Sequence, residues 1–144
     1  MLIFRSFSAG LIGALPLLFS ITCTFGLMGW LGIELDIVTA LLSSISIGLG
    51  VDYTIHMFWR LRTEIRQGSS YADAIRVSLR TIGRGISINA FAVILGFSVL
   101  FFSGFPLIRS FAFLIIISLF LCLISSLMLI PAIVIIRKPR FFTK

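Results

Sequence analysis

The sequence has few charged residues and few of the residue types that build catalytic or metal sites. Only 12% of its 144 residues are charged, and it contains a single histidine. The two cysteines, Cys23 and Cys122, stand alone without metal-ligand spacing. No nucleophile with a base and no phosphate-binding glycine loop can be recognised. We therefore do not expect an enzyme, a metal or cofactor, or a nucleic acid partner.

What the sequence has instead is long apolar runs. Apolar residues make up 59% of the chain, and its mean hydropathy is +1.18. One membrane span needs about 20 such residues, so the runs predict four transmembrane helices. The predicted spans are 8–31, 36–59, 85–103 and 107–136. The predicted fold class is therefore an all-α membrane protein, with one transmembrane domain over residues 1–144.

The basic residues predict the orientation in the membrane. All but Arg109 lie before the first span, between the second and third spans, or after the fourth span. These residues are Arg5, Arg60, Arg62, Arg66, Arg76, Arg80, Arg84, Arg137, Lys138, Arg140 and Lys144. Positively charged loops stay on the cytoplasmic side. Both termini and the middle loop are therefore expected in the cytoplasm, with the chain in the inner (plasma) membrane.

The middle loop itself is expected to be ordered. The second helix should begin after the N-cap Asp36 and continue past Trp59 until Gly68 ends it. Ser70 then begins a capping-box pattern and a predicted amphipathic helix over residues 70–83. Its expected apolar face carries Ala72, Ile75, Leu79 and Ile82, and its other face carries Arg76, Arg80 and Arg84. Such a helix suits the cytoplasmic membrane surface, where its arginines either recruit anionic lipid or only anchor the topology.

Asp52 is the most informative residue, because it lies inside the second apolar run. A carboxylate at that depth costs roughly 2.5–3.5 kcal/mol on insertion scales, and such residues usually face a bundle interior or a cavity where they bind an ion or a proton. The alternative role is an interhelical hydrogen-bond anchor. Asn89, the other strongly polar side chain within a span, either joins helices by hydrogen bonds or takes part in a proton relay.

The neighbours of Asp52 extend this prediction. Gly48 and His56 lie one turn away on the same helix face. Gly48 and Gly50 leave room for another helix or for water beside the carboxylate, and Tyr53 supplies a hydroxyl. His56 either passes the proton on or only holds an interfacial position. The predicted proton relay therefore consists of Asp52, Tyr53, His56 and Asn89, with Gly48 and Gly50 as packing positions.

Several separated segments resemble one known family. The stretch from Gly48 to His56 is similar to the GxxxD motif on the fourth transmembrane helix of transporters of the resistance–nodulation–division (RND) superfamily, in the branch of the mycobacterial large membrane proteins (MMPL) and Patched-like sterol-sensing domains. Residues 74–84, 96–106 and 129–132 resemble later segments of the same half-transporter, in the same order. The resemblance covers essentially the whole chain.

The resemblance implies proton-driven export of hydrophobic or amphiphilic compounds, with Asp52 in proton translocation and Tyr53 as its companion. The chain is expected to be a fragment holding the last four helices of one half, in contact with membrane lipids and a second half, in an oligomer. One alternative is a sterol- or lipid-sensing bundle that binds partners without transport. A further alternative, a small four-helix exporter working as a dimer, lacks the early intramembrane Glu of small multidrug exporters.

Overall fold

The computed structural model describes residues 7–34 and 36–137, and every regular element in this part is helical. The elements are α1 (Phe7–Trp30), α2 (Ile37–Arg66), α3 (Tyr71–Ser78), a π-helical turn η1 (Leu79–Gly83), α4 (Arg84–Ser98), a 3-10 turn η2 (Val99–Phe102) and α5 (Pro106–Arg137). Four helical runs are long and apolar enough to cross a membrane. This confirms the predicted all-α membrane bundle. Arg5, Lys138, Arg140 and Lys144, on which part of the predicted orientation depends, lie outside the described residues.

Local side-chain chemistry sets both ends of α2. Asp36 caps its first turn: the Thr39 amide donates to Asp36 Oδ1 at 2.7 Å, and the Asp36 amide donates to Thr39 Oγ1 at 2.8 Å. The helix continues past Trp59 to Arg66 and ends before Gly68, whose φ is +90°. Glycine adopts this left-handed conformation without the steric cost that other residues meet. The capping residue and the stop at Gly68 are thus confirmed.

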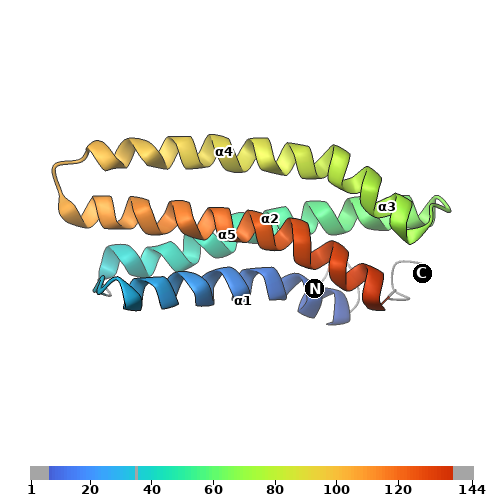
Figure 1. Cartoon of the computed structure of the whole chain (residues 1–144), viewed down its shortest axis with the longest axis horizontal. Coiled ribbons are helices and arrows are strands. Elements are labelled where there is room, and N and C mark those ends of the chain that lie inside the picture. The colour runs from blue at the N-terminus through green and yellow to red at the C-terminus, as the bar shows by residue number, and fades with distance from the viewer. Residues whose placement is uncertain (1–6, 35, 138–144) are drawn as a thin grey trace.

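The helix that follows does not stop where the sequence predicted. Ser70 caps α3, with its hydroxyl accepting from the Asp73 amide at 3.2 Å, as expected. The helical run then continues through η1 and α4 to Phe102, without the predicted boundary between residues 83 and 85. Gly83 has helical dihedral angles (φ −56°, ψ −41°), so it does not interrupt the run. In Figure 1, α3 and α4 follow one another along one side of the molecule.

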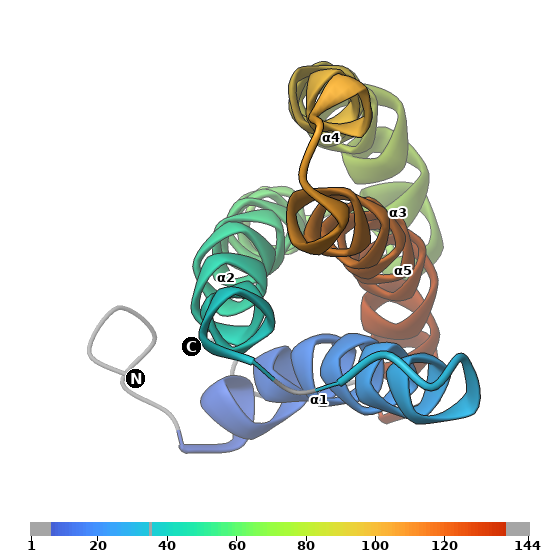
Figure 2. The same cartoon turned by 90° about the vertical axis from the view of Figure 1, so that its left-hand side faces the viewer.

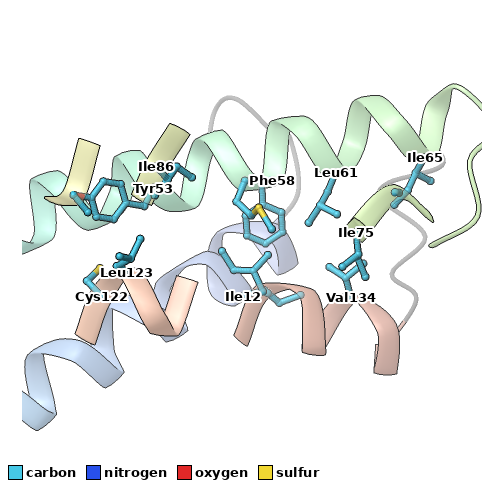
Figure 3. Close-up of a cluster of buried hydrophobic side chains, with 14 residues drawn as sticks. Ile12, Tyr53, Phe58, Leu61, Ile65, Ile75, Ile86, Cys122, Leu123 and Val134 are labelled. Carbon is cyan, nitrogen blue, oxygen red and sulfur yellow. The ribbon is translucent and has the colours of Figure 1, made fainter. Parts of the chain in front are cut away.

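The protein buries a face of α3 that includes only part of the predicted apolar face. Ala74, Ile75 and Ser78 are buried, whereas Ala72 and Leu79 are exposed. The reason is that α3 contacts both α2 and α5, so that its covered face is directed between these two helices. Ile75 lies in one apolar cluster with residues of both neighbours (Figure 3).

The long helices are not equally covered. The first, second and fifth helices pack against one another, and α5 also contacts α4. Viewed along the bundle, α4 lies on the outer side of α5, away from α1 (Figure 2). The molecule thus consists of a three-helix core, α1–α2–α5, and a peripheral helix, α4.

Close packing in the core depends on a glycine and on serine hydroxyls. A Cβ atom at Gly50 would overlap the side chains of Leu17 on α1 and Cys122 on α5. The Ser118 hydroxyl of α5 shares a hydrogen bond of 2.7 Å with Ser46 of α2, and its carbonyl accepts from the Ser20 hydroxyl of α1 at 2.8 Å. Ser118 therefore links all three core helices.

Candidate functional site

Asp52 and His56 form a polar pair near the middle of α2. They lie one helical turn apart, and Asp52 Oδ1 is 3.2 Å from His56 Nε2. Their side chains are 55% and 58% exposed. Gly48, one turn earlier, is exposed as well, and a Cβ there would meet no atom within 4 Å. The three residues thus share one open face of α2, within a helix apolar enough to cross a membrane.

Tyr53, the next residue along, points into the protein. It is 1% exposed and belongs to an apolar cluster with Cys122 and Leu123 of α5 and Ile86 of α4 (Figure 3). Its hydroxyl is buried and has no hydrogen-bond partner among the described residues. A buried hydroxyl without a partner is costly and calls for a specific explanation. Tyr53 therefore places a hydroxyl without a hydrogen-bond partner on the buried side of α2, next to Asp52 in the sequence.

A single cavity of about 350 Å³ brings the predicted relay residues together. It lies between α2 and the run η1–α4. Its lining comprises Asp52, Tyr53 and His56 from α2, and Ile82, Gly85, Ile86 and Asn89 from the facing run. Asn89 is exposed, and among the described residues no hydrogen bond joins its side chain to Asp52. The structure thus places all four predicted relay residues around one space.

The two glycines near Asp52 have different surroundings. Gly48 lies on the open face and leaves space beside it. Gly50 is buried and allows the close approach of α1 and α5 described above. Gly50 therefore makes room for neighbouring helices, whereas the space beside Gly48 is open.

The cavity has the chemistry of a site for proton exchange. A carboxylate, an imidazole, an amide and a phenol surround it, and the first two are already in hydrogen-bonding range. Carboxylates and imidazoles both accept and release protons. In the part of the chain that the structure describes, no three His, Cys, Asp or Glu side chains come together to hold a metal ion.

Sequence reasoning missed two groups of residues. Ile82, Gly85 and Ile86 line the cavity, but nothing in their local pattern distinguishes them from other apolar positions. The serines that link the core helices were also missed, although hydroxyls within apolar spans often join helices. Their spacing along separate helices does not reveal which of them meet.

Comparison with known proteins identifies the family. The chain matches the MMPL family over residues 1–140. A membrane protein of Methanocaldococcus jannaschii is 30% identical over 135 residues, which is 94% of this chain and 35% of that protein. Protein patched homolog 2 of Mus musculus is 31% identical over 140 residues, or 96% of this chain and 12% of that protein. No solved structure gives a significant match.

A third relative, MmpL11, has different functional names in different organisms. In Mycobacterium tuberculosis it is called a heme uptake protein, and it is 27% identical over 134 residues, 91% of this chain and 14% of that protein. In Mycolicibacterium smegmatis it is called an exporter of mycolic acid-containing lipids, and it is 27% identical over 96 residues, 67% of this chain and 10% of that protein.

All these relatives are much longer than the chain. The chain spans about a third of the length of the Methanocaldococcus jannaschii protein and a smaller share of the others. The match to the family nevertheless extends over nearly every residue of this chain. The described part also holds helices long and apolar enough to cross a membrane. The chain therefore belongs to the MMPL family.

Proposed function

We propose that the chain is the proton-coupling part of a transporter that exports hydrophobic or amphiphilic compounds. In this proposal Asp52 takes up and releases a proton within the membrane, and His56 and Asn89 assist the transfer. The observation that carries the proposal is the cavity of about 350 Å³ around Asp52, lined by the other three predicted relay residues.

The proton would drive transport by changing how the helices pack. A proton crossing a potential of about 100 mV releases about 2.3 kcal/mol. To use this energy, the two protonation states of Asp52 must favour different arrangements of the bundle. The boundary between α2 and the run η1–α4 suits this role, because the cavity already separates the two there.

The open face of α2 supports a second half as partner. Asp52 and His56 are more than half exposed, although they lie in the middle of an apolar helix. Exposed to lipid, a carboxylate at that depth is expensive, so such groups face protein or a water-filled space. We infer that another transporter half, from this or another chain, covers this face in an oligomer within the inner (plasma) membrane, with both termini in the cytoplasm.

The substrate class follows from the relatives by analogy. MmpL11 is named for heme in one organism and for mycolic acid-containing lipids in another, and both are amphiphilic compounds. The two names give opposite directions of transport. Export is the direction that the resemblance to the RND superfamily implies, and it is the direction we propose.

The experiment that tests the proton site replaces Asp52 with an uncharged residue of the same shape. The chain is reconstituted in liposomes with an imposed pH gradient, and proton movement is followed with an enclosed pH-sensitive dye. The Asp52→Asn variant should fall to the background of protein-free liposomes, because an amide cannot take up the proton. Its helical content and its elution volume in size-exclusion chromatography should match those of the unchanged chain.

The matched control is Asp73→Asn. Asp73 is also an exposed carboxylate, but it lies in the first turn of α3 and accepts a hydrogen bond from Ser70. This variant carries the same change in charge and should keep full proton movement. Wild-type proton movement in Asp52→Asn would refute the proposed role, as would an equal loss in Asp73→Asn.

A lipid-sensing bundle is the second candidate function. The observation that favours it is an apolar hollow of about 350 Å³ on the run α4–η2, lined by Val93, Gly96, Phe97 and Leu100. A sterol or lipid tail would fit such a surface. A sensor should bind a fluorescent sterol equally well with Asp52 or Asn at position 52 and move no protons, and this outcome would favour sensing over transport.

A further inference from the structure

Three arginines form a row along one side of the run α3–η1–α4. Arg76, Arg80 and Arg84 are spaced four residues apart and all are exposed. Residues at this spacing lie on the same helix face. In an α-helix of 3.6 residues per turn, each step of four drifts slightly around the axis. The wider π-helical turn at Leu79–Gly83 holds more residues per turn, so it offsets part of this drift.

The positive charge of this row is not neutralised within the described part of the chain. None of the three arginines forms an ion pair there. The only acidic residue between positions 71 and 102 is Asp73, which is bound to the Ser70 hydroxyl at 2.7 Å. Glu64 on α2 is already paired with Arg60 at 2.7 Å. The row is therefore available to an external anion.

An exposed apolar strip continues directly from the row. Ile88 lies one turn beyond Arg84 and is 61% exposed, and Leu95 further along α4 is 69% exposed. Phe91 on α4 and Val99 at the start of η2 are exposed as well. Three guanidinium groups at one end and an apolar surface along the rest match a molecule with an anionic head and long hydrocarbon tails.

We propose that the run α3–η1–α4 binds an anionic phospholipid, with its phosphate on Arg76, Arg80 and Arg84 and its acyl chains along α4. Guanidinium groups bind phosphate through paired N–H donors. Clusters of basic residues next to a membrane helix attract anionic lipids. A soluble polyanion would leave the apolar strip uncovered, so charge and shape together favour the lipid. The proposal is independent of the proton role of Asp52.

The test compares binding of two lipids with the same acyl chains. The full chain in detergent micelles is titrated with phosphatidylglycerol or with phosphatidylcholine, and bound lipids are counted by native mass spectrometry. Each arginine near a membrane surface contributes about fivefold to the preference for anionic lipid. The variant with Arg76→Gln, Arg80→Gln and Arg84→Gln should therefore lose the preference by on the order of a hundredfold. The triple lysine variant, which keeps the charge, should retain most of it.

A control variant separates this site from a general effect of charge. Arg109→Gln removes one charge near the start of α5, where Arg109 Nε donates to the Ser103 carbonyl at 2.6 Å, and should leave the preference close to that of the unchanged chain, whereas Arg80→Gln alone should lower it about fivefold. An equal loss in this control, or no loss in the triple glutamine variant, would overturn the proposal.

A second measurement needs no variant and so stands even if a variant fails to fold. The unchanged chain should lose its preference for phosphatidylglycerol as the salt concentration rises to about 1 M, because salt screens exposed charges. A preference that persists at high salt would contradict binding through exposed arginines.

Discussion

The fifth helix and the fourth are both long and apolar, but the protein covers them very differently. Half of the 18-residue apolar stretch of α5 is buried, against 11% of the corresponding stretch within the run from Tyr71 to Phe102. Leu114 and Leu119 of α5 are fully buried, whereas Leu95 of α4 is largely exposed. Lipid tails are as apolar as the surface of another helix, so an apolar side chain gains no hydrophobic free energy by leaving lipid for the protein. Apolar sequence alone therefore does not drive burial. Specific packing and hydrogen bonds decide which helix becomes the core.

The candidate site lies between the core, to which α5 and α2 both belong, and the peripheral helix α4. Asp52 and Tyr53 come from the core helix α2, and Asn89 comes from the peripheral helix α4. A tightly packed core holds the carboxylate in place, while a helix with few contacts is free to take a second position. The contrast between α5 and α4 therefore has a functional meaning, and it can be tested by substitutions in matched pairs.

The largest expected difference concerns two glycines on opposite sides of α2. Gly50→Val should lower the free energy of unfolding by about 3 kcal/mol, because its side chain would overlap Leu17 and Cys122. Gly48→Val should lower it by less than about 1 kcal/mol, since that position is open. Unfolding by titration with a denaturing detergent measures both. Equal effects would mean that α1, α2 and α5 do not form the tight core described above.

The second pair compares two leucines on the two helices. Leu119→Ala should cost about 2 kcal/mol, at the low end for a buried leucine, because lipid provides no hydrophobic drive and mainly packing contacts are lost. Leu95→Ala on α4 should cost less than about 0.5 kcal/mol. The same detergent titration applies. If Leu95→Ala lowered the free energy of unfolding as much as Leu119→Ala, then Leu95 would have to be buried against other helices in the isolated chain.

The smallest expected effect concerns the serine that links the three core helices. Ser118→Ala should cost about 1 kcal/mol, because it removes the hydroxyl that bonds to Ser46. Ser46→Ala in the same background should add little, since the two side chains share one bond. Ser98→Ala is the control, because that hydroxyl bonds only to Leu95 O of its own helical run. If the two substitutions lowered the free energy of unfolding by fully additive amounts, the shared hydrogen bond between Ser118 and Ser46 would be contradicted.

Local chemistry explains why some features of the site could be predicted from sequence. Asp52 and His56 were expected on one face because their spacing is one helical turn, and they lie there at 3.2 Å. The cap at Asp36 and the helix end at Gly68 likewise depend on residues close in sequence. Such interactions form within a few residues and need no knowledge of the fold.

Features that depend on distant residues were predicted less well. The sequence did not indicate which side of α3 the protein itself covers, because the positions of α2 and α5 decide this, and Ala72 and Leu79 stay exposed. The predicted end of that helix before residue 85 was wrong, since nothing at Gly83 forces the backbone out of a helix.

By itself the sequence determined that this chain is a bundle of membrane-spanning helices with a carboxylate inside one span. Length, hydropathy and the turn residues are enough for that, because each helix satisfies its own backbone hydrogen bonds. Only the tertiary structure decided that Asn89 shares a cavity with Asp52 and that Ser118 links three helices. It also decided that α5, rather than α4, forms the core. The physical reason is that helix association in lipid depends on the matching of particular side chains across helices, and hydropathy carries no record of it.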